Sequence, residues 1–204
     1  MPTATFFPSP EFAWAFYLVL AGLTLVAAYV DWQRLVVPKP LVALTLLLGL
    51  GFNVARGVGL AGQGQAVYFF GPGGPIWGGS DGLLFSLAGF GIGFGLFFIM
   101  WILGTCGGGD VKWFAALGAW LGPLWSLYIL MGTWVVVMFG FVVVGWAVHF
   151  VRYGRKPRKA QVAYSFPVAV STIAILAWVC RAELGLIPPG SVGTVPQAAI
   201  QSSR

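Results

Sequence analysis

Residues 83–103 read LLFSLAGFGIGFGLFFIMWIL, and this stretch decides the fold class. It carries no charge, and Ser86 is its only residue that is neither apolar nor glycine. Roughly 20 apolar residues are enough to cross a bilayer as a helix. Because polar and apolar residues do not alternate here, the stretch is predicted to be a membrane helix and not a barrel strand. Its glycines at positions 89, 91, 93 and 95 are expected to allow close helix packing.

The composition of the whole chain is that of an integral membrane protein. Of its 204 residues, 59% are hydrophobic and 8% are charged, and the mean hydropathy is +0.90. This apolar surface exceeds what a soluble core of the same size could bury. The formal charge of +6 does not indicate nucleic acid, because the basic residues form short clusters between apolar segments. We therefore expect an all-α, polytopic membrane bundle that is surrounded by lipids and binds no nucleic acid.

Six segments are predicted to cross the membrane: residues 12–30, 40–59, 82–104, 111–121, 124–151 and 162–181. The stretch 111–151 is about twice the length of one crossing, so two helices must share it. We place the turn between them at Gly122 and Pro123, and a turn near Gly132 and Thr133 would give the same parity. Residues 1–187 are then one transmembrane domain, and the polar tail 188–204 is predicted to be disordered.

The distribution of basic residues predicts the orientation. Eight of them fall on one side of the predicted bundle: Arg34, Lys39, Lys112, Arg152, Arg155, Lys156, Arg158 and Lys159. The other side holds Arg56, Arg181 and Arg204. The positive-inside rule makes the first side cytoplasmic, so both termini are expected outside, in a cell inner (plasma) membrane.

Two aspartates, Asp31 and Asp110, fall at the cytoplasmic ends of the first and fourth predicted spans. Carboxylates at the edge of a bilayer are costly, so two on one membrane face indicate a functional site. If they lie a few ångströms apart they share a proton, and the pair can activate water and polarise a peptide carbonyl. The glycines at positions 107, 108 and 109 would let a substrate backbone approach Asp110.

Structural roles are the alternative for each acidic residue. Asp31 could cap a helix end beside Arg34, and Asp110 could cap the start of the fourth span. Asp81 is expected to cap the start of the third span on the outer face.

Two other chemistries remain open. Cys106 and His149 could form a nucleophile and base, although core packing and a helix end also explain them. A small carrier or assembly scaffold could use the membrane-edge aspartates to bind protons or cations. A carrier would need polar residues in the middle of several spans.

Two motifs resemble those of the type IV prepilin peptidases. Residues 31–38, DWQRLVVP, resemble the first catalytic motif, in which an aspartate precedes a basic stretch and an aliphatic–proline pair. Residues 107–123, GGGDVKWFAALGAWLGP, resemble the second, GxGD-type motif and the helix that follows it. Lys39 departs from the family, which usually has Asn or a similar polar residue there.

The chain resembles the short, peptidase-only branch of that family, which serves Flp or tight-adherence pili. Only nine residues, 31–39, separate the first two spans, so the cytoplasmic insert that accompanies N-methylation in longer members is absent. The resemblance implies an aspartic endopeptidase, without cofactor or metal, that removes the leader of prepilin or pseudopilin substrates at the cytoplasmic face. Its implied catalytic residues are Asp31 and Asp110, with Gly107, Gly109, Lys112 and Pro38 in the motifs and the substrate approach. The substrate, the oligomeric state and the identity of the base within the pair stay open.

Overall fold

The computed structural model describes residues 6–34, 36–65, 69–70, 73–104, 106–137, 165–179, 181 and 184. The regular secondary structure of these residues is helical: α1 (Pro10–Arg34), α2 (Lys39–Gly62), α3 (Pro75–Ile102), α4 (Gly108–Val137) and α6 (Ser165–Val179). Four of the helices, α1 to α4, are long and apolar enough to cross a membrane, whereas α6 has 15 residues. The all-α prediction is confirmed for the described residues. The count of six spans and the external termini stay predictions.

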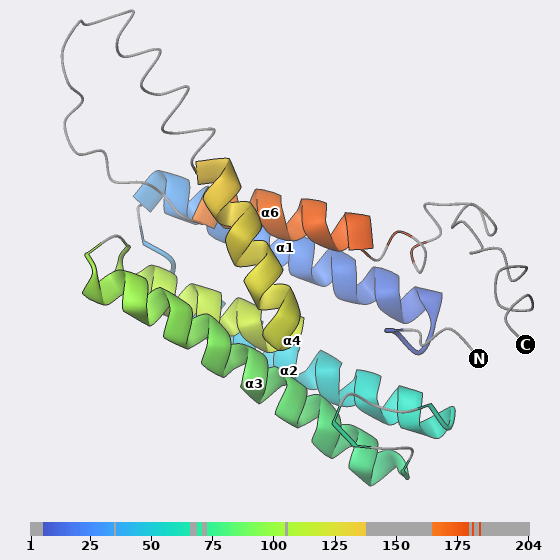
Figure 1. Ribbon diagram of the computed structural model, residues 1–204. Coiled ribbons are helices and arrows are strands. Elements are labelled where there is room, and N and C mark those ends of the chain that lie inside the picture. The colour runs from blue at the N-terminus through green and yellow to red at the C-terminus, as the bar shows by residue number, and fades with distance from the viewer. Residues whose placement is uncertain are drawn as a thin grey trace, which may run out of the picture.

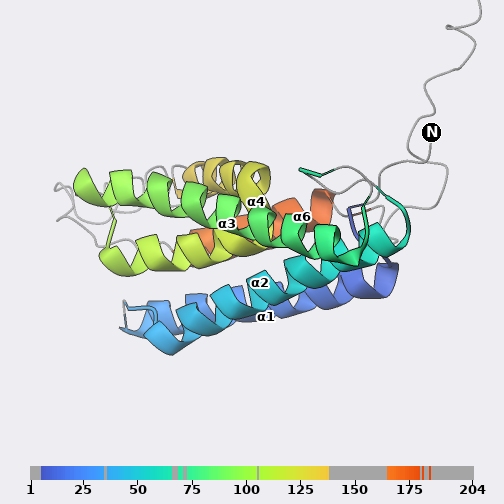
Figure 2. The same ribbon diagram turned by 90° about the horizontal axis from the view of Figure 1, so that it is seen from below.

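The helices run alternately along one axis. Figure 1 shows the last turn of α1 and the first turns of α2, α4 and α6 at the same end of the bundle. We call this the aspartate end, since Asp31 lies in that last turn of α1 and Asp110 in that first turn of α4. In both views α3 lies beside the first half of α4, and α6 packs along α1 (Figures 1 and 2).

A break divides α4 into two halves. Gly122 has φ 70° and ψ −177°, a left-handed conformation that glycine adopts without strain, and Pro123 follows it. In Figure 1 the second half of α4 turns away from α3 and runs back toward the aspartate end. The turn predicted at Gly122 and Pro123 is confirmed. The alternative near Gly132 is wrong, because Thr133 is helical and its hydroxyl donates to the Ile129 carbonyl at 2.7 Å.

Side chains from two neighbouring helices satisfy the carbonyls at this break. Pro123 has no N–H to donate to the Ala119 carbonyl four residues earlier. That carbonyl instead accepts the side-chain amide of Asn53 at 2.8 Å and the hydroxyl of Ser86 at 2.7 Å. The same amide nitrogen lies 3.0 Å from the Trp120 carbonyl. Such donors make a Gly–Pro break tolerable in a membrane, where lipid offers no hydrogen bonds.

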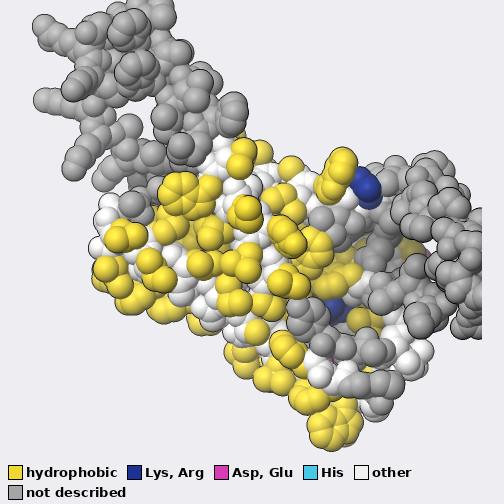
Figure 3. All heavy atoms as spheres, viewed as in Figure 1, with side chains coloured by type: hydrophobic (Ala, Val, Ile, Leu, Met, Phe, Trp, Pro, Cys, Tyr) yellow, Lys and Arg dark blue, Asp and Glu magenta, His cyan; other side chains and the backbone are white. Residues whose placement is uncertain are grey.

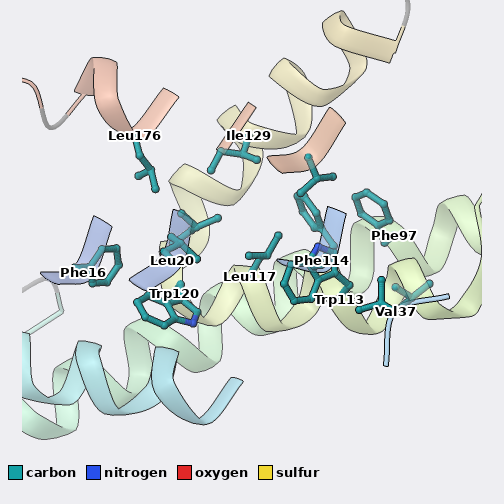
Figure 4. Packing of buried hydrophobic residues seen from close by; sticks show 14 of the residues in the cluster. Phe16, Leu20, Val37, Phe97, Trp113, Phe114, Leu117, Trp120, Ile129 and Leu176 are labelled. Carbon is teal, nitrogen blue, oxygen red and sulfur yellow. The ribbon is translucent and has the colours of Figure 1, made fainter. Parts of the chain in front are cut away.

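The hydrophobic core surrounds the first half of α4. Trp113, Phe114 and Trp120 are fully buried there, as Figure 4 shows from close by. The ring of Trp120 meets Phe16 of α1 with centroids 4.9 Å apart, and Phe114 stacks on Phe97 of α3 at 4.2 Å. These aromatic contacts fix α4 against both α1 and α3.

Glycines allow α3 to approach its neighbours closely. A side chain on Gly89 would collide with the carbonyl oxygen of Gly118, and a side chain on Gly93 would lie 2.8 Å from that of Phe114. The packing role predicted for these two glycines is therefore confirmed. Gly91 and Gly95 face open space, so the same prediction is wrong for them.

The start of α3 corrects one prediction. The helix begins at Pro75, after Gly74, and not at residue 82. Proline suits the first position of a helix, because its fixed φ is helical and no N–H is needed there. Asp81 therefore lies inside α3 and does not cap it. Its Oδ1 accepts the backbone N–H groups of Phe69 and Phe70 at 2.6 and 3.0 Å, which holds that loop on the helix.

Arg56 is a buried residue of α2, only 3% exposed. Its guanidinium carbon lies 4.3 Å from the ring centroid of Phe6 and 4.4 Å from that of Phe85, so the charge is held between two aromatic faces. Its Nη1 also donates to the Phe6 carbonyl at 3.5 Å. Arg56 is thus a packing group, and it does not belong among the surface charges that predict orientation.

The outside of the described bundle is apolar. In Figure 3 hydrophobic side chains cover most of the described surface on one face, with few Lys or Arg. Large exposed hydrophobic residues occur on all five helices. An apolar exterior of this extent suits contact with lipid. With its four long apolar helices, the chain has the architecture of a multi-pass membrane protein.

Candidate active site

Asp31 is buried at the aspartate end, with 4% of its surface exposed. It lies in the last turn of α1, where the free carbonyl groups of a helix disfavour an anion. Its Oδ2 accepts the backbone N–H of Ser165, the first residue of α6, at 3.3 Å. Asp31 therefore caps the start of α6, and not the end of its own helix beside Arg34.

Asp110 is half-buried in the first turn of α4. Its Oδ2 accepts the backbone N–H of Gly107 at 2.9 Å, while its own N–H donates to the Gly107 carbonyl at 3.1 Å. A carboxylate is favoured at this position by the helix dipole and by the unpaired N–H groups. The capping role considered for Asp110 is confirmed.

The two carboxylates come from distant parts of the sequence and lie near each other. The negative charge of Asp31 acts electrostatically on Asp110. In each carboxylate the cap uses Oδ2, and Oδ1 accepts no hydrogen bond from a described residue. Capping therefore uses one oxygen of each aspartate and leaves the other without a bond to the described residues.

The backbone before Asp110 is open. Gly107, Gly108 and Gly109 are all exposed. A side chain on Gly109 would meet nothing within 4 Å, whereas one on Gly107 would lie 3.3 Å from Asp110 Oδ2. Packing within the described residues therefore does not require glycine at position 109. An open backbone beside a carboxylate is a suitable approach for a peptide chain.

The other two predicted motif residues have different surroundings. Pro38 precedes the first residue of α2, and its carbonyl accepts the N–H groups of Leu41 and Val42 at 3.1 and 3.2 Å. These contacts make it the cap of that helix. Lys112 is exposed on α4, and within the described chain it forms no ion pair with Asp110. Its place in the motif and the substrate approach stays a prediction.

Cys106 is a poor nucleophile in this environment. Its thiol is partly buried against the core and donates to the Phe97 carbonyl at 3.5 Å. Burial, together with the nearby charge of Asp110, raises the pKa of this thiol to about 11. The reactive thiolate is therefore scarce at neutral pH. His149, its possible partner, lies outside the described residues.

Ser165 was not among the predicted site residues, although the structure places it against Asp31. The predicted topology does put the start of the sixth span near the proposed site, but no local pattern indicates this particular contact, because it joins the last turn of α1 to the first residue of α6. Asn53, which supports the helix carrying Asp110, did have a signal: it is an amide in the middle of an apolar span.

A family comparison covers both aspartates. The sequence profile of the type IV leader peptidase family matches residues 18–144, more than half of the chain. The matched region includes most of α1 and all of α2, α3 and α4. No curated protein and no solved structure matches the chain. The extent of the profile match, over the helices that carry Asp31 and Asp110, shows that this chain belongs to the type IV leader peptidase family.

Proposed function

We propose that the chain is a membrane aspartic endopeptidase that cleaves the leader peptide from prepilin-like substrates. The observation that carries this proposal is the position of Asp31 and Asp110 at the same end of the bundle, within electrostatic range and each with one oxygen not used in capping. A charged pair at the edge of apolar helices is costly, and catalysis gives it a purpose. Membership of a leader peptidase family supports the same reaction.

In the proposed mechanism the pair holds one proton between two carboxylates. The ionised carboxylate takes a proton from water, and the water oxygen attacks the carbonyl carbon of the scissile peptide bond. The protonated carboxyl donates a hydrogen bond to the carbonyl oxygen, which gains negative charge. When the carbon–nitrogen bond breaks, a proton passes to the departing amine and the pair returns to its singly protonated state.

The proposed position of the reaction is the cytoplasmic edge of the membrane. Support comes from the basic residues, most of which the predicted topology puts on the same side of the membrane as Asp31 and Asp110. A prepilin or pseudopilin carries a short basic leader before an apolar helix, so its cleavage site would lie at the same depth. The open backbone at Gly109 would face the extended segment around the scissile bond. The mature pilin or pseudopilin that cleavage releases would then be assembled into a pilus or secretion system of the Flp type.

The carrier alternative receives less support from the polar residues of the bundle. Asn53 and Ser86 bond the carbonyl groups at the α4 break, and Arg56 is held between two aromatic rings. Hydrogen bonding at the α4 break and aromatic packing thus give these polar side chains in the middle of α2 and α3 a structural role. We therefore favour the peptidase.

Replacing Asp31 or Asp110 with Asn tests the proposal. Each variant keeps an acceptor oxygen for its capping bond but cannot share a proton. We expect leader cleavage to fall to background in D31N and in D110N, with the double variant scarcely worse than either. Asp81→Asn is the matched control, because it alters a buried carboxylate near the start of α3, at the end of the bundle away from Asp31 and Asp110. This variant should retain cleavage per folded molecule. Near-normal cleavage by either D31N or D110N would rule out the aspartic mechanism.

A further inference from the structure

The first residue of α6 is in direct contact with the candidate active site. The backbone N–H of Ser165 donates to Asp31 Oδ2 at 3.3 Å, and Ser165 is only 1% exposed. Along the rest of its length α6 packs against α1 and the second half of α4. The hydrogen bond therefore lies inside a packed helix junction, where solvent screening is weak.

Two helix ends act on the Asp31 carboxylate in opposite directions. The last turn of α1 presents carbonyl groups, which disfavour negative charge. The first turn of α6 presents N–H groups, which favour it. In the described chain Ser165 supplies the N–H that bonds this carboxylate, so it offsets the unfavourable field of α1.

The buried hydroxyls of the bundle differ in their hydrogen bonds. Thr24, Thr45, Ser126 and Thr133 each donate to a carbonyl of their own helix. Three hydroxyls of α6, those of Ser165, Ser171 and Thr172, are buried and have no hydrogen-bond partner among the described residues. The backbone N–H of Ser165, and not its hydroxyl, therefore sets this residue apart from Ser171 and Thr172.

We propose that Ser165 is a positioning residue of the aspartate pair, whose backbone N–H orients Asp31 and stabilises its carboxylate form. This inference rests on the proposed function. It makes the start of α6 a third component of the site, beside the ends of α1 and α4. Ser165 acts through Asp31 and takes no part in bond making or breaking.

The charged groups around Asp31 define what else could influence it. Asp110 acts on it from α4. Arg34 of α1, Lys39 of α2 and Lys112 of α4 are exposed, and α6 contains no charged residue. A change at Ser165 that adds no charge therefore leaves these electrostatic neighbours in place.

Proline and alanine at position 165 distinguish the effect of the Ser165 backbone N–H from that of its hydroxyl. S165P removes the N–H and the hydroxyl, while S165A removes the hydroxyl alone. Proline is tolerated here, since the first residue of a helix has no intrahelical partner for its N–H. The measurement is the pH profile of kcat/KM for a purified prepilin with a basic leader. We expect the acidic limb of S165P to lie about one pH unit above that of S165A, because a charged hydrogen bond is worth a factor of about ten or more.

An ester at the same position guards against a folding defect in S165P. Stop-codon suppression with lactic acid replaces the amide of residue 165 with an ester and leaves an alanine side chain. It should move the acidic limb in the same direction relative to S165A. The proposal would be overturned if the ester variant and S165A had the same acidic limb. It would also be overturned if the acidic limb of S165A were already shifted from that of the wild type by as much as the limb of S165P. A merely structural role of Ser165 would lower activity equally at all pH values, and that result would also contradict the proposal. If D31N cleaves normally, the proposed function fails; if D31N is inactive and the limbs coincide, only the role of Ser165 fails.

Discussion

The support of the α4 break by Asn53 and Ser86 predicts a specific departure from additivity. Both side chains donate to the Ala119 carbonyl, which Pro123 cannot reach with an N–H group. In either single alanine variant this carbonyl keeps one donor. In the double variant it keeps neither, so a buried carbonyl is left without both of these donors.

The number of hydrogen bonds lost in each variant, multiplied by typical hydrogen-bond energies, gives the expected loss of stability. A hydrogen bond between membrane helices contributes about 0.6 kcal/mol on average and at most about 1.7 kcal/mol. N53A loses the bonds to the Ala119 and Trp120 carbonyls, so it should lower the free energy of unfolding by about 1–2 kcal/mol. S86A loses one bond and should cost about 0.6 kcal/mol. The double variant should exceed the sum of the two by about 1 kcal/mol, the lower end of the cost of an orphaned buried carbonyl.

Reversible unfolding in mixed detergent and lipid micelles measures these values. T24A is the matched control, because the Thr24 hydroxyl donates to Ala21 within α1 and does not reach α4. The pair N53A and T24A should therefore add within about 0.5 kcal/mol. If N53A and S86A were equally additive, the Ala119 carbonyl would not be the group that couples them, and the explanation of the break would be wrong.

Three further results are expected. G109A should leave the unfolding free energy almost unchanged, since its added methyl group meets nothing within 4 Å. Its kcat/KM for prepilin should fall by about tenfold or more, because the methyl group narrows the approach of the substrate. Unchanged cleavage by G109A would contradict this role. Alkylation of Cys106 should be slow at pH 8 and accelerate as the pH rises toward the thiol pKa of about 11, and C106A should cleave normally, whereas its inactivity would favour the cysteine mechanism. Mass spectrometry of pilin matured in the presence of S-adenosylmethionine should find an unmethylated N-terminus, and a gain of one methyl group would refute the interpretation of the missing insert.

Most of the helical architecture could be predicted, because hydropathy and breakers are local properties of the sequence. The Gly122–Pro123 turn is the clearest example: a positive φ and a missing N–H both belong to the residues themselves. The start of α3 was misplaced for a related reason. The residues around Pro75 have the composition of a loop, yet packing of Gly78 and Gly82 against α2 extends the helix back to Pro75.

Contacts between distant segments could not be predicted in the same way. The position of Arg56 between Phe6 and Phe85 depends on how the N-terminal segment packs against α2 and α3. The bond from Ser165 to Asp31 depends on the meeting of two helix ends. The topology predicted only that Asp31 and Asp110 share one face of the membrane. Their electrostatic interaction follows from the packing of the helices around α4.

Capping and catalysis by the two aspartates are compatible, because they use different atoms. Asp31 Oδ2 holds the start of α6, and Asp110 Oδ2 holds the start of α4. An aspartate with one oxygen fixed by a backbone N–H has little rotational freedom, so its other oxygen is held in a defined direction. Asparagine can reproduce the fixed oxygen but not the proton exchange at the second one. Loss of cleavage without loss of stability in D31N and D110N would therefore separate the two roles, and a parallel loss of both would mean that capping alone explains the pair.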